Sequence, residues 1–139
     1  MNTRSWLVLN SNKYTIVFIS WMVMITLLSF FSFSGVDDEI SFPYMDKLVH
    51  FVFYSVAAIT LGFALRERSS GKMRLSNALL ISFLFSLVFG IIIEVLQSTY
   101  TSWRSGELAD VIANTIGALT GTAFLKLLFS GNRQLKWKI

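Results

Sequence analysis

The chain has no cysteine, a single histidine and few charged residues for its length. Without cysteine there is no disulfide bond, no thiolate nucleophile and no cysteine-based metal site. Charged residues account for 14% of the 139 residues, whereas a soluble domain usually carries about 25%. A net charge of +4 and a pI near 9.6 would suggest a nucleic-acid partner in a soluble protein. So few charges argue against a soluble domain, and we predict no nucleic-acid partner.

Apolar sequence is what the chain has in excess. Hydrophobic residues make up 54% of it, and the mean hydropathy is +0.61. Four apolar stretches, approximately 14–33, 48–65, 75–96 and 108–129, match the roughly 20 residues that cross a bilayer. The first is longer than a signal-peptide core and precedes no Ala-x-Ala cleavage site. We therefore predict an all-α integral membrane protein, a compact bundle of four transmembrane helices.

The basic residues predict the orientation of this bundle, because they accumulate on the cytoplasmic side of membrane spans. Ten of the twelve lie before the first stretch, between the second and third, or at the end of the fourth and beyond: Arg4, Lys13, Arg66, Arg68, Lys72, Arg74, Lys126, Arg133, Lys136 and Lys138. We predict a cytoplasmic N-terminal segment (1–13), a transmembrane domain (14–130) and a basic cytoplasmic tail (131–139) in a bacterial inner membrane.

Lys47 and Arg104 are the two basic residues that break this pattern, because both fall on the predicted outer side. Orientation bias cannot explain them, so each needs a local partner or a ligand. One interpretation is a salt bridge to Asp46, Glu107 or Asp110. The other is an anion site built from a compact ammonium and a planar guanidinium. The two are compatible if the salt bridge is released when a ligand binds.

Polar residues interrupt three of the apolar stretches, at spacings of three or four residues that place them on one helix face. They are Asp46, His50 and Tyr54 in the second stretch, Glu94 and Gln97 in the third, and Asp110 and Asn114 in the fourth. In antiparallel helices, with about 1.5 Å rise per residue, His50, Glu94 and Asn114 reach a similar shallow depth. Ionisable groups in a membrane are costly to bury, so we predict that these residues converge on one outer-side pocket.

Small residues continue the same faces toward the inner side. Gly117 and Gly121 follow Asn114 in the fourth stretch. Small residues at this spacing let helices approach closely in lipid, where little hydrophobic force acts between them. We predict that these two glycines serve helix packing and do not contact a ligand.

At these positions the chain resembles the VanZ-like family, the membrane proteins related to the teicoplanin-resistance protein VanZ. The resemblance runs from about 46 to 121 and rests on three blocks with intact order and spacing. They are Asp46-Lys47-x-x-His50-Phe51-x-x-Tyr54, then Glu94-x-x-Gln97, then Arg104, Glu107, Asp110, Asn114, Gly117 and Gly121. The resemblance implies a bacterial cell-envelope membrane protein with a link to tolerance of glycopeptide antibiotics. It does not supply a reaction.

Our first hypothesis is a protein that binds or acts on an anionic amphiphile, such as a lipid-linked precursor or a lipid headgroup. The candidates for proton transfer are His50, Glu94, Asp46 and Asp110. An unperturbed imidazole has a pKa of about 6.5, and carboxylates can orient it. Substrate binding would fall to Lys47, Tyr54, Gln97, Arg104 and Asn114, which offer cations, a hydroxyl and amides. No serine or cysteine nucleophile signature is present, so turnover, if any, would not pass through a covalent acyl intermediate.

Three alternatives remain open at this point. A metal ion at His50, Glu94 and Asp110 is the weakest of them, because the chain has one histidine, so the site is predicted without a cofactor. A small transporter or proton-relay subunit is the second, and a non-catalytic scaffold held together by buried hydrogen bonds is the third. The polar start of the fourth stretch also leaves open a re-entrant segment in place of a full crossing.

Overall fold

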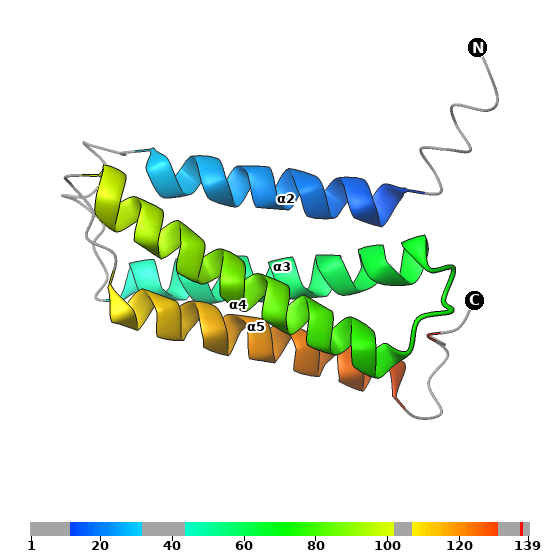
Figure 1. Cartoon of the computed structure of the whole chain (residues 1–139). Helices are drawn as coiled ribbons and strands as arrows, with labels where there is room; N and C mark the ends of the chain where they lie inside the picture. Colours follow the sequence, from blue (N-terminus) through cyan, green and yellow to red (C-terminus); the bar gives the residue numbers. More distant parts are fainter. Residues whose placement is uncertain (1–11, 32–43, 102–106, 131–136, 138–139) are drawn as a thin grey trace, which may run out of the picture.

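The computed structural model describes residues 12–31, 44–101, 107–130 and 137. All regular secondary structure in these ranges is helical. The four helices are α2 (Lys13–Phe30), α3 (Met45–Arg68), α4 (Leu75–Tyr100) and α5 (Leu108–Phe129). Consecutive helices run in opposite directions, so α3 and α5 begin at the end of the bundle where α2 and α4 finish (Figure 1).

All four helices are long and apolar enough to cross a membrane. The shortest has 18 residues and, at about 1.5 Å per residue, approaches the roughly 30 Å thickness of a bilayer core. Their outward faces carry large exposed apolar side chains, including Val17, Leu80, Val95, Ile112 and Leu127. An aqueous surface does not carry such a continuous apolar area. The prediction of a multi-pass, all-α membrane protein is confirmed.

The helices differ from the predicted stretches at their ends. α3 begins at Met45 and continues to Arg68, and α4 continues to Tyr100, about one turn beyond the predicted limit. The fourth stretch forms an unbroken helix of 22 residues. The helix is therefore not broken between Leu108 and Phe129, and it is long and apolar enough to cross a membrane.

α3 packs most extensively against α5, and glycines make this contact possible. A Cβ added to Gly117 would collide with the backbone oxygen of Phe51, and one added to Gly121 would collide with that of Ser55. The Ser55 hydroxyl also donates a 2.9 Å hydrogen bond to the Gly117 carbonyl oxygen. The two backbones therefore touch where Gly117 and Gly121 lie.

α2 lies at the edge of the bundle, against α3 and with little contact to α4. Its first turn is capped by a neighbouring helix, because the Glu67 carboxylate of α3 accepts hydrogen bonds from the backbone nitrogens of Tyr14 (3.3 Å) and Thr15 (3.0 Å). Backbone N–H groups in a first helical turn have no partner within their own helix. Farther along, the Trp21 indole nitrogen donates to the Phe53 carbonyl oxygen at 2.9 Å.

Most of the two predicted cytoplasmic segments, 1–13 and 131–139, lies outside the described residues. Trp137 is the described part of the tail, and it is buried against Phe129 at the end of the bundle where α3 and α5 finish. Its indole nitrogen donates to the Met73 carbonyl oxygen at 2.6 Å, and its own carbonyl accepts from Arg66 at 2.9 Å. These contacts attach the tail to the connection between α3 and α4.

Candidate functional site

The structure brings the predicted polar residues of α3, α4 and α5 together at one end of the bundle, called the polar end below. It is the end where α3 and α5 begin and α4 finishes (Figure 1). His50, Glu94 and Asp110 are each only 4% exposed, and Asn114 is 1% exposed. The side chains face the bundle interior, while the lipid-facing surface of the same helices is apolar.

His50 is the centre of this cluster. Its Nδ1 atom lies 3.0 Å from the Asn114 Oδ1 atom and 3.4 Å from the Glu94 Oε1 atom. Amide and carboxylate oxygens accept hydrogen bonds, so this placement favours the tautomer with hydrogen on Nδ1. Nε2 is then the basic nitrogen of the ring. The arrangement joins three helices and fixes the orientation of the imidazole.

Lys47 lies three residues before His50 in α3, and carboxylates surround its ammonium group. Its Nζ atom is 2.5 Å from Asp46 Oδ2, 2.6 Å from Glu107 Oε2 and 3.0 Å from Asp110 Oδ1. The three partners are the ones that the salt-bridge interpretation named. Asp46 and Glu107 are about half exposed, whereas the Asp110 side chain is 5% exposed. The pair with Asp110 is therefore the one least screened by solvent.

The charges at the polar end are predominantly negative. The described residues there include one ammonium, Lys47, and four carboxylates: Asp46, Glu107 and Asp110 around Lys47, and Glu94 beside His50. Arg104, the second predicted cation, lies outside the described residues, so its role as an anion-binding group stays a prediction. An anionic headgroup that approaches Lys47 has to displace or neutralise the carboxylates around it.

Gln97 and Tyr54 take different places in the site. The Gln97 amide nitrogen donates a 2.8 Å hydrogen bond to the Ser29 carbonyl oxygen and so connects α4 to α2. Tyr54 is 1% exposed, and its hydroxyl has no hydrogen-bond partner within the described ranges. Its ring packs beside Phe89, at 6.5 Å between ring centroids.

Gly90 of α4 lies beside two side chains of this cluster. A Cβ at this position would lie 3.1 Å from Tyr54 Cε1 and 3.2 Å from Asn114 Nδ2. The tyrosine ring and the amide therefore meet over Gly90, one helical turn below Glu94. Its four-residue spacing from Glu94 placed it on the polar face, but only the structure shows which side chains use the space.

Several buried polar atoms near this face lack hydrogen-bond partners among the described residues. They are the Tyr54 hydroxyl, the Asn114 Nδ2 atom and the hydroxyls of Ser82 and Ser86. An unsatisfied buried group costs about 1–3 kcal/mol. Groups of this kind usually bind water or a ligand, so the interior below His50 can take further hydrogen-bonding partners.

A family model described as VanZ/LLP1 matches residues 3–129. The chain belongs to the VanZ/LLP1 family. No curated protein and no solved structure matches it. The VanZ/LLP1 match includes all four helices, so α2 is part of the family domain, although the three sequence blocks begin only in α3.

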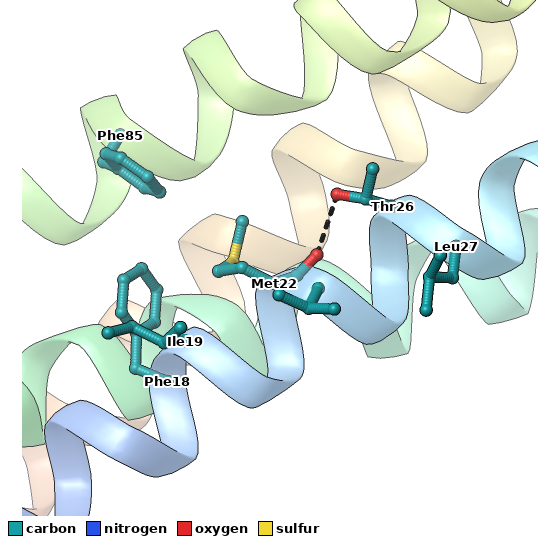
Figure 2. Close-up of a pocket in the computed structure, with 7 residues that line it drawn as sticks. Phe18, Ile19, Met22, Thr26, Leu27 and Phe85 are labelled. Atoms are coloured by element: carbon teal, nitrogen blue, oxygen red, sulfur yellow. Dashed lines mark hydrogen bonds between the residues drawn. The ribbon is translucent and has the colours of Figure 1, made fainter.

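An apolar groove adjoins the polar end of this VanZ/LLP1 protein. It runs between α2 and α4, encloses about 340 Å³ and is lined by Phe18, Ile19, Met22, Val23, Thr26, Leu27 and Phe85. Figure 2 shows Phe85 of α4 opposite Phe18 of α2, and the two rings pack edge to face at 5.6 Å. The opposite end of the groove lies one turn from the hydrogen bond between Gln97 and Ser29.

Proposed function

We propose that this protein binds an anionic amphiphile, such as a lipid-linked precursor or an anionic lipid, with its headgroup at the polar end and its apolar chain between α2 and α4. One observation carries the proposal. The groove between these helices reaches to within one helical turn of the Gln97–Ser29 hydrogen bond, and Glu94 lies one turn from Gln97. A ligand with an apolar chain and a polar headgroup matches an apolar groove that lies next to a polar cluster.

The groove suits an acyl or isoprenoid segment. Its volume falls within the roughly 300–1,000 Å³ range of small-molecule sites, and almost all of its lining is apolar. Thr26 does not change this character, because its hydroxyl donates to the Met22 carbonyl oxygen at 2.8 Å (Figure 2). The groove is open on its outer side, where an acyl or isoprenoid chain could enter from lipid.

The headgroup would meet one cation and several buried hydrogen-bond donors. Lys47 attracts a phosphate or carboxylate once its own carboxylates have been displaced or neutralised. The Asn114 amide nitrogen and the Tyr54 hydroxyl are buried donors with unused capacity. His50, oriented by Asn114 and Glu94, would supply proton transfer if the bound molecule is also a substrate.

We place the polar end at the outer face of a bacterial inner membrane, with both termini in the cytoplasm. The charge distribution supports this orientation, because Arg66, Arg68, Lys72 and Arg74 flank the connection at the opposite end of the bundle. An outer-leaflet site would reach the lipid-linked precursors of the cell envelope. Tolerance of glycopeptide antibiotics such as teicoplanin would follow if the bound molecule belongs to the material these drugs recognise.

Lipid analysis of purified protein tests the proposal. Thr26→Trp should fill the groove near the polar end, whereas Val17→Trp places the same ring on an exposed face of α2 that does not line the groove. Mass spectrometry should find a specific anionic lipid with wild type and Val17→Trp, and a severalfold loss with Thr26→Trp. The same bulk lipids in all three preparations would contradict the proposal.

Proton relay is a second candidate, favoured by one observation. Ser82 and Ser86 are fully buried on the inward face of α4, and their hydroxyls have no hydrogen-bond partner in the described structure. They continue the polar face of Glu94 toward the other end of the bundle. Leu84 lies between them in the sequence and points outward, at 46% exposure. In proteoliposomes, proton flux that falls in Ser86→Ala but not in the lipid-facing Leu84→Ala would favour this function.

A further inference from the structure

We propose that His50, Glu94 and Asp110 form a binding site for a divalent first-row transition metal ion. One nitrogen or oxygen from each of the three side chains lies within 4.8 Å of the others. The three residues come from α3, α4 and α5, and each is 4% exposed. An imidazole and two carboxylates from separate helices of a four-helix bundle are ligand types that such bundles use for metal ions.

The spacing of the donor atoms supports a coordination site. Bonds of about 2.0–2.2 Å place adjacent ligand atoms about 3.0 Å apart in an octahedral sphere and about 3.4 Å apart in a tetrahedral one. His50 Nδ1 lies 3.4 Å from Glu94 Oε1 and 3.0 Å from Asn114 Oδ1. The Asn114 oxygen is thus a fourth donor beside the three, and a metal ion on Nδ1 would require the other imidazole tautomer.

Two buried groups point to a further occupant of the cluster. The Asn114 Nδ2 atom and the Tyr54 hydroxyl belong to side chains that are 1% exposed, and neither atom has a hydrogen-bond partner among the described residues. Both side chains meet over Gly90, one turn from Glu94. Water or a ligand oxygen on a metal ion at the cluster would give these donors an acceptor.

The ligand set also indicates the class of metal. Carboxylates alone suit Mg²⁺ or Ca²⁺, whereas an imidazole together with carboxylates suits Mn²⁺, Fe²⁺ or Zn²⁺. Asp110 has two oxygens, and its ion pair with Lys47 uses Oδ1. Asp46, Glu107 and Asp110 form a second group with the same 4.8 Å limit, but it contains no imidazole and Lys47 already binds all three.

A divalent cation would reconcile the negative charge of the polar end with an anionic ligand. It would offset the Glu94 and Asp110 carboxylates and could accept a headgroup oxygen as a further ligand. This bridging role rests on the proposed function, whereas the metal site itself does not. In the sequence the metal site was the weakest alternative because the chain has a single histidine. The structure adds the short distances between the three donor groups, which the sequence did not give.

Metal loading of purified protein in detergent, without added lipid, tests the site. After treatment with a chelator, wild type should take up about one Mn²⁺ or Zn²⁺ per chain by elemental analysis, and titration calorimetry should show saturable binding. Glu94→Gln and His50→Ala should weaken binding at least tenfold. Glu67→Gln, a carboxylate change at the opposite end of the bundle, should bind as wild type does.

The outcomes separate this inference from the proposed function. No saturable uptake by folded wild type overturns the metal site, and so does equal binding by wild type and a folded Glu94→Gln variant. Circular dichroism identifies variants that have not folded, and the wild-type measurement decides the matter if both site variants unfold. Lipid analysis of the chelated protein runs separately, so a protein that retains its lipid without metal would keep the proposed function and lose the bridging role.

Discussion

The imidazole of His50 and the side-chain amide of Asn114 join α3 to α5 through a 3.0 Å contact between Nδ1 and Oδ1. Both side chains are buried, His50 at 4% exposure and Asn114 at 1%. The contact holds the imidazole in one orientation and leaves the amide nitrogen of Asn114 beside Gly90. The proposed proton-transfer role of His50 depends on this orientation.

Replacing Asn114 with alanine should destabilise the bundle. Interhelical hydrogen bonds in membranes contribute about 0.6 kcal/mol on average and up to about 1.7, and His50 would lose a buried partner. We expect a loss of roughly 1–2 kcal/mol in unfolding by denaturing detergent. Thr120→Ala is the matched control, because that hydroxyl is exposed and bonds only the Ile116 carbonyl oxygen of its own helix. Equal stability of the two variants would remove the structural basis of the site.

Replacing Gly117 with alanine should separate α3 from α5. The added Cβ collides with the Phe51 backbone oxygen, which cannot move as a flexible side chain does. Overpacking of this kind costs about 1–3 kcal/mol, so the midpoint of thermal unfolding in detergent should fall. Ala123→Leu adds more volume to an exposed position of the same helix and should leave the midpoint unchanged. A Gly117→Ala variant as stable as wild type would show that the close approach is not required.

The existence of the helices could be predicted from composition, but their ends could not. Long apolar runs have few alternatives to a membrane helix, so all four were found. The extra turns of α3 and α4 contain polar residues such as Arg68 and Tyr100, and the backbone stays helical through them. An apolar stretch of sequence ends where the side chains become polar, whereas the helix continues beyond that point.

The placement of His50, Glu94 and Asn114 at one level follows from antiparallel order and helical rise, and was therefore accessible from sequence. The hydrogen-bond partner of each polar group could not be predicted from the sequence. Gln97 turns toward Ser29 on α2 and away from the cluster, although its spacing placed it with Glu94. The groove was also hidden, because α2 is apolar on all sides and its sequence does not show which face meets α4.

Replacing Lys47 with glutamine should destabilise the protein through Asp110. The two exposed carboxylates around Lys47 can return to water, but Asp110 would stay buried without its cation. Breaking a buried pair costs about 3–5 kcal/mol, and exposed pairs are worth roughly 0–1, so we expect an intermediate loss for this partly exposed lysine. Adding Asp110→Asn should recover most of it in a double-mutant cycle. Purely additive effects would mean that the pair is not coupled.

Replacing Gln97 with leucine should loosen α2 at the polar end. The variant loses the hydrogen bond from the amide nitrogen to the Ser29 carbonyl oxygen, which joins α4 to α2 about one turn beyond Thr26. Because α2 otherwise contacts α4 only weakly, its last turn should open more often. Hydrogen–deuterium exchange in nanodiscs should then increase severalfold for peptides covering 26–31. Ser98→Ala, which removes a hydroxyl bonded within α4, should exchange like wild type. If Gln97→Leu does so as well, the Gln97–Ser29 bond does not hold the end of α2 against α4.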